Sequence, residues 1–225
     1  MKKLFTLLAL TISFSMNAQM DDNSQNNNSA GTWAVAMGYS TEASGSRSTA
    51  MGSDTTASGT RSTAMGSGTT ASGSYSTAMG SGTTASGYVS TAMGYNTTAN
   101  GWMSTAMGYN TTASGEFSTA MGNGTTASDY GSLVIGQFNS SGSSATSAYL
   151  FSTSAPAFVI GNGADSSNKS DAFKVMFNGD ATVSNDLTVS GDVVVSSDAR
   201  LKSNIVSLGS TLSRLLLIDG KSYEM

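Results

Sequence analysis

Aromatic side chains recur at fixed places of a repeated sequence unit, and they are the residues best suited to contact a ligand. They stand at the first or the second variable position after an Ala-Ser-Gly triplet, which is Ala-Asn-Gly before Trp102, or directly after Met-Gly pairs. An exposed column of rings forms a rigid surface that can bind glycans or proteins. The alternative is that the rings only stack to stabilise turns or cover a seam between chains. The candidates are Tyr75, Tyr88, Trp102 and Phe117 in the first group, and Tyr39, Tyr95 and Tyr109 in the second.

The composition argues against most other kinds of catalytic or binding site. The 225 residues include no His and no Cys, so the usual zinc ligands, thiol nucleophiles and His-based triads are missing. Residues 161–165 (GNGAD) and 178–180 (NGD) lack the roughly six oxygen ligands of a calcium loop, and we interpret both as turns. We therefore expect no metal and no cofactor. The net charge of −4 and the lack of a basic run also argue against a nucleic-acid partner.

The elements that must position the aromatic residues come from a repeat of fourteen residues. Its consensus is S-T-A-M-G-x-x-T-T-A-S-G-x-x, and the register never slips. Self-similarity at a fixed period is the signature of stacked structural units. The Met of each unit falls at 37, 51, 65, 79, 93, 107 and 121, and residues 134–136 (VIG) occupy the next place.

Each unit is long enough for two short strands and two tight turns, with its glycines at positions of positive φ. A helix is disfavoured, because each glycine would cost about 1 kcal/mol relative to Ala. Alternation places Thr49 and Met51 on one face of a strand, and Ser48 and Ala50 on the other. We predict an all-β fold, a parallel β-roll or solenoid whose core packs Met against Thr and Ala.

Such a core is only one side chain thick, so the solenoid is expected to need further burial between chains. The opposite, small-residue face would let neighbouring solenoids approach closely, and we expect a homotrimer. That face contains Ala50, Ala64, Ala78, Ala92 and Ala106.

Residues 34–136 resemble the head repeat of YadA-like trimeric autotransporter adhesins, whose units read S-V-A-I-G-x-x-A-x-A-x-G. Thr49 and Met51 stand where that family has Val and Ile, and Thr55 with Ala57 takes the A-x-A place. The resemblance implies a left-handed parallel β-roll in a homotrimer that displays an adhesive surface.

Residues 197–205 (SDARLKSNI) resemble the start of a second family, the intramolecular chaperone domains of phage endosialidases and tail fibres, or peptidase S74 family. Its opening reads S-D-x-R-L-K-x-N-I. The resemblance implies a domain that folds a trimeric fibre and then cuts itself off. By this resemblance, Ser197 is the nucleophile and Lys202 its base, which would require desolvation to lower the pKa of the Lys202 amine.

The chain is predicted to contain five segments. A short cationic start and an apolar run indicate a secretory signal peptide over 1–18, and no later stretch is apolar enough to span a membrane. We expect a flexible linker at 19–33, the head solenoid at 34–136, a β-rich stem at 137–196, and a truncated chaperone domain with a short helical piece at 197–225.

Three functions are compatible with this organisation. The first is a secreted or cell-surface, adhesin-like or tail-fibre-like trimer that binds a protein or glycan and is not an enzyme, apart from single-turnover self-cleavage. The second is a self-cleaving fibre protein whose chaperone domain directs trimer folding. The third is an ice-binding solenoid, because Thr side chains recur in columns.

Overall fold

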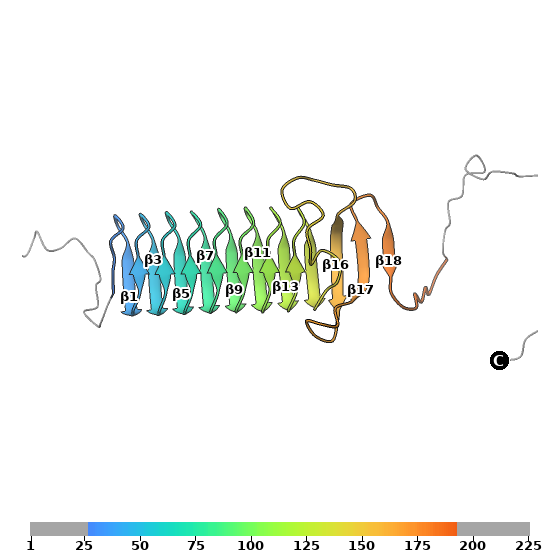
Figure 1. Ribbon diagram of the computed structural model, residues 1–225, viewed down its shortest axis with the longest axis horizontal. Helices are drawn as coiled ribbons and strands as arrows, with labels where there is room; N and C mark the ends of the chain where they lie inside the picture. Colours follow the sequence, from blue (N-terminus) through green and yellow to red (C-terminus); the bar gives the residue numbers. More distant parts are fainter. Residues whose placement is uncertain (1–26, 193–225) are drawn as a thin grey trace, which may run out of the picture. The chain divides into compact units, whose positions relative to one another are not determined.

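The computed structural model describes residues 27–192, which form strands and turns (Figure 1). Within this range no helix has the length and apolar character that a membrane crossing requires. The chain divides into two units, residues 1–186 and 187–225, and only residues 187–192 of the second are described. The predicted signal peptide, C-terminal helical piece and chaperone segment lie outside the described residues.

Each fourteen-residue unit forms one coil with a long and a short strand, as the repeat predicts. The long strands are β1 Val35–Tyr39, β3 Thr49–Ser53, β5 Thr63–Ser67, β7 Thr77–Ser81, β9 Thr91–Tyr95, β11 Thr105–Tyr109, β13 Thr119–Asn123 and β15 Leu133–Gln137. The short strands are β2 Glu42–Ala43, β4 Thr56–Ala57, β6 Thr70–Ala71, β8 Thr84–Ala85, β10 Thr98–Ala99, β12 Thr112–Ala113 and β14 Thr126–Ala127.

Successive coils stack in parallel and in register, so every residue lies beside its equivalent fourteen positions along the chain. Met37, for example, pairs with Met51, and Thr56 pairs with Thr70. The long strands belong to an 11-stranded sheet, and the short strands form a separate 7-stranded sheet. The all-β parallel solenoid predicted from the repeat is therefore confirmed.

The interior of the solenoid is lined by alanines and by small hydroxyl residues. Ala50 on the long strand and Ala57 on the short strand are both 0% exposed, and their equivalents along the array, with Val134 at the last long strand, are at most 1% exposed. Ser48 and Thr55 are also buried, and their hydroxyls have no hydrogen-bond partner. The two sheets thus lie so close together that only small side chains fit between them.

This arrangement corrects the predicted assignment of faces. The alternation along the strand is as expected, but Ala50 points into the core while Met51 and Thr49 lie half-buried on the outer face. Ala64, Ala78, Ala92 and Ala106 are likewise 0% exposed and cannot contact a neighbouring chain. The reason is the width of the interior, since a methionine would hold the sheets too far apart for the short turns to connect them.

Both consensus glycines lie where the backbones of successive coils meet. A Cβ on Gly52 would lie 1.9 Å from the carbonyl oxygen of Gly66, and a Cβ on Gly59 would lie 2.0 Å from the carbonyl oxygen of Gly73. Gly52 also has the predicted positive φ, at +123°, whereas Gly59 does not, contrary to the prediction. Close stacking of the backbones therefore explains the glycine at both positions, and positive φ adds a second reason at Gly52.

Beyond the last repeat, β16 Pro156–Asn162 adds a further parallel strand in register with β15, pairing Ile160 with Ile135. Strands β17 Asp171–Met176 and β18 Ala181–Val183 then continue the sheet in the antiparallel sense. The predicted hairpin at Asn178-Gly179 is present between them.

Side-chain amides complete the sheet hydrogen bonding at both ends of the array. Within the array, Thr112 N–H donates to the carbonyl of Thr125 in the next coil. At the last coil, Thr126 N–H donates to Asn139 Oδ1 (2.8 Å), and Asn139 Nδ2 donates to the Thr126 carbonyl (2.9 Å). At the first coil, Thr41 N–H donates to Asn27 Oδ1 (3.1 Å). The Asn139 amide thus takes the place of a further coil's backbone, whereas at the first coil the backbone of Asn28 pairs with β2 and the Asn27 side chain adds to it.

The narrow interior generates a mutational prediction. We expect Ala78→Trp to lower the free energy of unfolding by about 3 kcal/mol or more, because the ring must enter a column of buried alanines. Circular dichroism during thermal melting at fixed protein concentration measures this. Ser74→Trp is the control, since Ser74 stands at the turn position where later coils carry Tyr88 and Trp102. Equal melting of the two variants would contradict the assignment of Ala78 to the core.

Candidate functional site

Four of the predicted aromatic residues come together in one continuous column along an edge of the solenoid. Neighbouring ring centroids lie 5.7 Å apart for Tyr75 and Tyr88, 5.9 Å for Tyr88 and Trp102, and 5.4 Å for Trp102 and Phe117. Tyr130 extends the column with a centroid 5.2 Å from that of Phe117. We call these five residues the aromatic column. They occupy the turns between a short strand and the next long strand.

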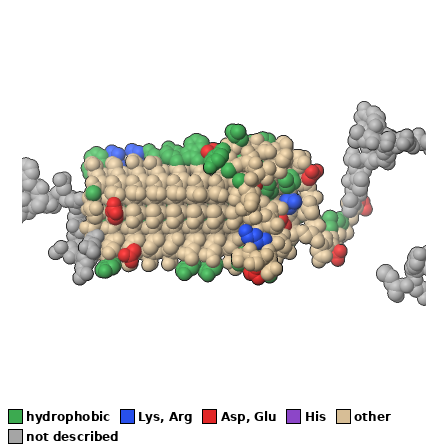
Figure 2. Space-filling view, viewed as in Figure 1, with side chains coloured by type: hydrophobic (Ala, Val, Ile, Leu, Met, Phe, Trp, Pro, Cys, Tyr) green, Lys and Arg blue, Asp and Glu red, His purple; other side chains and the backbone are tan. Residues whose placement is uncertain are grey.

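Cations continue the column toward the N-terminus. The Arg61 guanidinium lies 5.1 Å from the centre of the Tyr75 ring and donates to its hydroxyl. Arg47 lies 4.4 Å from the centre of the Trp33 ring. Figure 2 shows a line of hydrophobic and basic side chains along this edge, at the top of the view. The edge is therefore one surface of stacked planar groups.

The backbone in this turn has a conformation that large side chains usually avoid. Each coil has two non-strand positions with left-handed φ, one in each turn. The turn after Met-Gly fills its position with small or amide residues such as Asp54, Asn96 and Asn110, which tolerate this conformation. The turn after Ala-Ser-Gly fills it with bulky residues instead. These are Trp33, Arg47, Arg61, Tyr75, Val89, Met103 and Phe117, with φ between 53° and 62°.

The three tyrosines that follow Met-Gly lie on the opposite edge, and only two of them meet. Tyr95 and Tyr109 stack face to face, with centroids 5.2 Å apart and an interplanar angle of 6°. Tyr39 pairs instead with Ser53 in the next coil. The second group of candidates is thus an isolated pair and a separate ring, and it forms no column.

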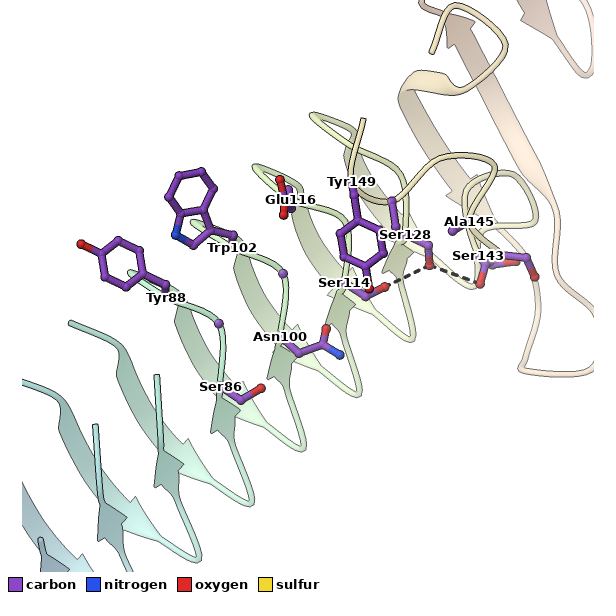
Figure 3. Close-up of a pocket in the computed structure, with 14 residues that line it drawn as sticks. Ser86, Tyr88, Asn100, Trp102, Ser114, Glu116, Ser128, Ser143, Ala145 and Tyr149 are labelled. Atoms are coloured by element: carbon purple, nitrogen blue, oxygen red, sulfur yellow. Dashed lines mark hydrogen bonds between the residues drawn. The ribbon is translucent and has the colours of Figure 1, made fainter. Parts of the chain in front are cut away.

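A groove of about 590 Å³ runs beside the aromatic column (Figure 3). One side carries Tyr88 and Trp102, and the other carries Ser86, Asn100 and Ser114 from one position of the repeat. A segment at residues 143–149, which includes Tyr149, bounds its C-terminal end. Sequence reasoning missed this groove, because the bounding segment lies outside the repeat.

A residue that differs from the repeat consensus anchors the segment at residues 143–149. Asp129 occupies the position of the Ala-Ser-Gly glycine and is 0% exposed. Its Oδ1 accepts hydrogen bonds from the backbone N–H groups of Thr146 (2.6 Å) and Ser147 (2.7 Å). Glu116 N–H also donates to the Ala148 carbonyl (2.9 Å). The change from Gly to Asp was the sequence signal that could have revealed this anchor.

The remaining candidate sites are the predicted self-cleavage pair and the turn at residues 161–165. Ser197 and Lys202 lie outside the described residues, so their roles stay a prediction. Within 161–165, Asp165 forms a turn in which its carboxylate accepts from Asn168 Nδ2 and from the N–H groups of Ser167 and Asn168. The Asn168 side chain, followed by these N–H groups, holds the pKa of the Asp165 carboxyl below its usual value. Among residues 27–192 no group of three or more acidic side chains could hold a metal ion.

The fold and surface together define a repeat-built β-solenoid that displays its side chains in columns. Five stretches of the chain match the YadA head domain repeat, which confirms the predicted resemblance of this region. A search of curated proteins found no match. The matching stretches are residues 30–55, 57–83, 85–101, 103–125 and 113–139.

The left-handed turn position offers a test of backbone strain. Val89 is β-branched and has a φ of 55°, so we expect Val89→Asn to raise the free energy of unfolding by about 1 kcal/mol. Chemical denaturation at fixed protein concentration measures this. Thr60→Asn is the matched control, because Thr60 is β-branched and exposed but has no positive φ. A loss of stability in Val89→Asn would instead show that the valine side chain makes contacts that outweigh the strain.

Proposed function

We propose that this chain is an exported, adhesin-like or tail-fibre-like surface protein that acts as a homotrimer and presents the aromatic column to a ligand. Support comes from the YadA head domain repeats, a type of domain found as surface-exposed trimers. The signal-peptide pattern at residues 1–18 supports export.

The contrast between the two left-handed turn positions is the observation that carries this proposal. One turn uses residues suited to its backbone, whereas the other holds large side chains at a cost of about 1–2 kcal/mol each. Folding alone does not favour that choice. Selection for large exposed side chains along this edge accounts for it, and the rings of Tyr75 and Phe117, which occupy the left-handed position, remain 44% and 38% exposed.

The outer face of the long strands supports the homotrimer. It carries a column of half-buried apolar side chains, one per coil, while the interior holds only small residues. Burial of that column against other chains would supply the apolar contact that an alanine-lined interior lacks. The column consists of Met37, Met51, Met65, Met79, Met93, Met107, Met121 and Ile135.

The ice-binding alternative has a weaker basis. Thr56 and its equivalents form a half-exposed column on the short strands. Thr55 and its equivalents, however, are 0% exposed, so the array is one threonine wide. The next outward-facing position, two residues after Thr56, is Ser in most coils and Asn100 in one. The side chains beside the threonine column are therefore not identical from coil to coil. Thermal hysteresis in cooled solutions would favour this function, and simple colligative freezing would not.

The homotrimer generates a prediction about the outer face. We expect Met79→Asp to abolish assembly, because a carboxylate would be buried against the partner chains without a counter-charge. Analytical ultracentrifugation with circular dichroism measures mass and folding together. The control is Thr84→Asp, a half-exposed residue on the outer side of β8. Sedimentation of Met79→Asp as the same oligomer as the unchanged chain would contradict the proposed interface.

Adhesion by the full chain tests the proposed function. Beads that carry the protein are allowed to settle on surfaces coated with mucin, gelatin or neither. We expect retention on at least one coated surface, and at least tenfold weaker retention for a Tyr75→Ala, Phe117→Ala double variant. The control is a Tyr95→Ala, Tyr109→Ala variant, which removes the opposite pair. Equal retention on coated and bare surfaces would contradict an adhesive role.

A further inference from the structure

We propose that the groove beside Tyr88 and Trp102 binds a neutral, linear oligosaccharide that lies along the solenoid axis. This inference rests on the proposed function and names the ligand class of that surface. The volume of about 590 Å³ is within the range of small-ligand sites. Its two sides differ in chemistry, as Figure 3 shows, and each matches one part of a sugar.

One side of the groove offers flat apolar rings. Tyr88 and Trp102 have centroids 5.9 Å apart and planes inclined by 35°, and both are nearly half exposed. Pyranose rings have an apolar face of C–H groups that packs on aromatic rings. Two neighbouring rings at this spacing therefore provide places for consecutive sugar units.

The other side offers hydrogen-bonding groups at the same period. Ser86 and Asn100 are exposed, and Ser114 donates its hydroxyl hydrogen to Ser128 Oγ (3.2 Å). Hydroxyl and amide groups can donate to and accept from the hydroxyls at the rim of a sugar. The buried Gly87 and Gly101 form a floor between the two sides, so the backbone does not block a ring from entering.

Charge selects against acidic ligands. Glu116 is the one charged residue among the described residues that line the groove, and no Lys or Arg is among them. A carboxylate, sulfate or phosphate on the ligand would meet this negative group without a compensating cation. The groove is therefore suited to neutral sugars.

Backbone pairing selects against an added peptide strand. Gly87 N–H donates to the Ala99 carbonyl (3.2 Å), and Gly101 N–H donates to the Ala113 carbonyl (3.2 Å). The coils thus satisfy these groove-floor donors among themselves, and they are not free for strand addition.

The groove has a defined extent. Toward the N-terminus, the position equivalent to Tyr88 is Ser74, and Tyr75, which continues the aromatic column, does not line the groove. Toward the C-terminus, the position equivalent to Trp102 is Glu116, and the segment held by Asp129 bounds the groove. This preformed shape favours a short stretch of a linear chain, because little ordering is needed on binding.

Fluorescence of Trp102 in the full chain tests the proposal. Trp33→Phe leaves Trp102 as the single tryptophan, since the chain has two. The probes are cellohexaose, chitohexaose and mannohexaose, with hexagalacturonate as an acidic comparison. We expect a saturable blue shift with at least one neutral hexasaccharide, and at least tenfold weaker binding of the acidic one. No shift with any of the three neutral probes would overturn the proposal.

Calorimetry with matched variants then locates the site. We expect Trp102→Ala and Asn100→Ala each to weaken binding of the active hexasaccharide about tenfold or more. Tyr109→Ala is the control, because Tyr109 is as exposed as Trp102 but lies on the opposite edge. Equal weakening by Tyr109→Ala would overturn the assignment to this groove. Loss of the oligomer in Trp102→Ala would assign the surface to chain contact and also overturn it.

Different experimental results would contradict the adhesive function and the sugar-binding groove. Retention on gelatin together with no hexasaccharide binding would overturn the sugar site and support the adhesive function. Hexasaccharide binding together with no retention on any coated surface would support the sugar site and overturn the adhesive function.

Discussion

In-register stacking of coils around a very narrow interior is the constraint on which the rest of this structure depends. Every residue lies beside its equivalent in the next coil, so a side chain that fits once must fit in each coil. Within the repeats before the last coil, Ala, Ser and Thr fill the space between the two sheets, and Gly stands where the backbones touch. Large side chains are therefore confined to the outside, where stacking turns them into columns.

Most of the fold could be predicted from the sequence. The sequence did not reveal, however, which face of each strand points into the core. Period and alternation fix the coils, the strands and which residues share a face. Hydrophobicity then points to Met51 as the core residue and Ala50 as the outer one, which is wrong. The deciding quantity is the distance between the sheets. It depends on turn geometry and backbone approach, as at Gly59, and composition does not reveal it.

The candidate surface was predictable to the same extent. Recurrence was enough to place Tyr88 and Trp102 at one position of the repeat and Tyr75 and Phe117 at the next, but not to show that rings from both positions meet in one column. The left-handed backbone beneath several of the large residues at this edge was not foreseen, since the prediction assigned positive φ to the glycines. The groove also escaped prediction, because its end depends on Asp129 and a segment without any period. Periodic features can be read from sequence, whereas contacts made once require the structure.

The asparagine amides at the two ends of the array have a consequence for how this gene can change. Asn139 at one end, and Asn27 together with the backbone of Asn28 at the other, bond to a coil edge that is built alike in every unit. Gain or loss of whole fourteen-residue units would leave both ends intact. Reading frame, register and end structure would all survive such an event. A lineage could thus lengthen or shorten the solenoid by whole coils, with the same stacking at every step.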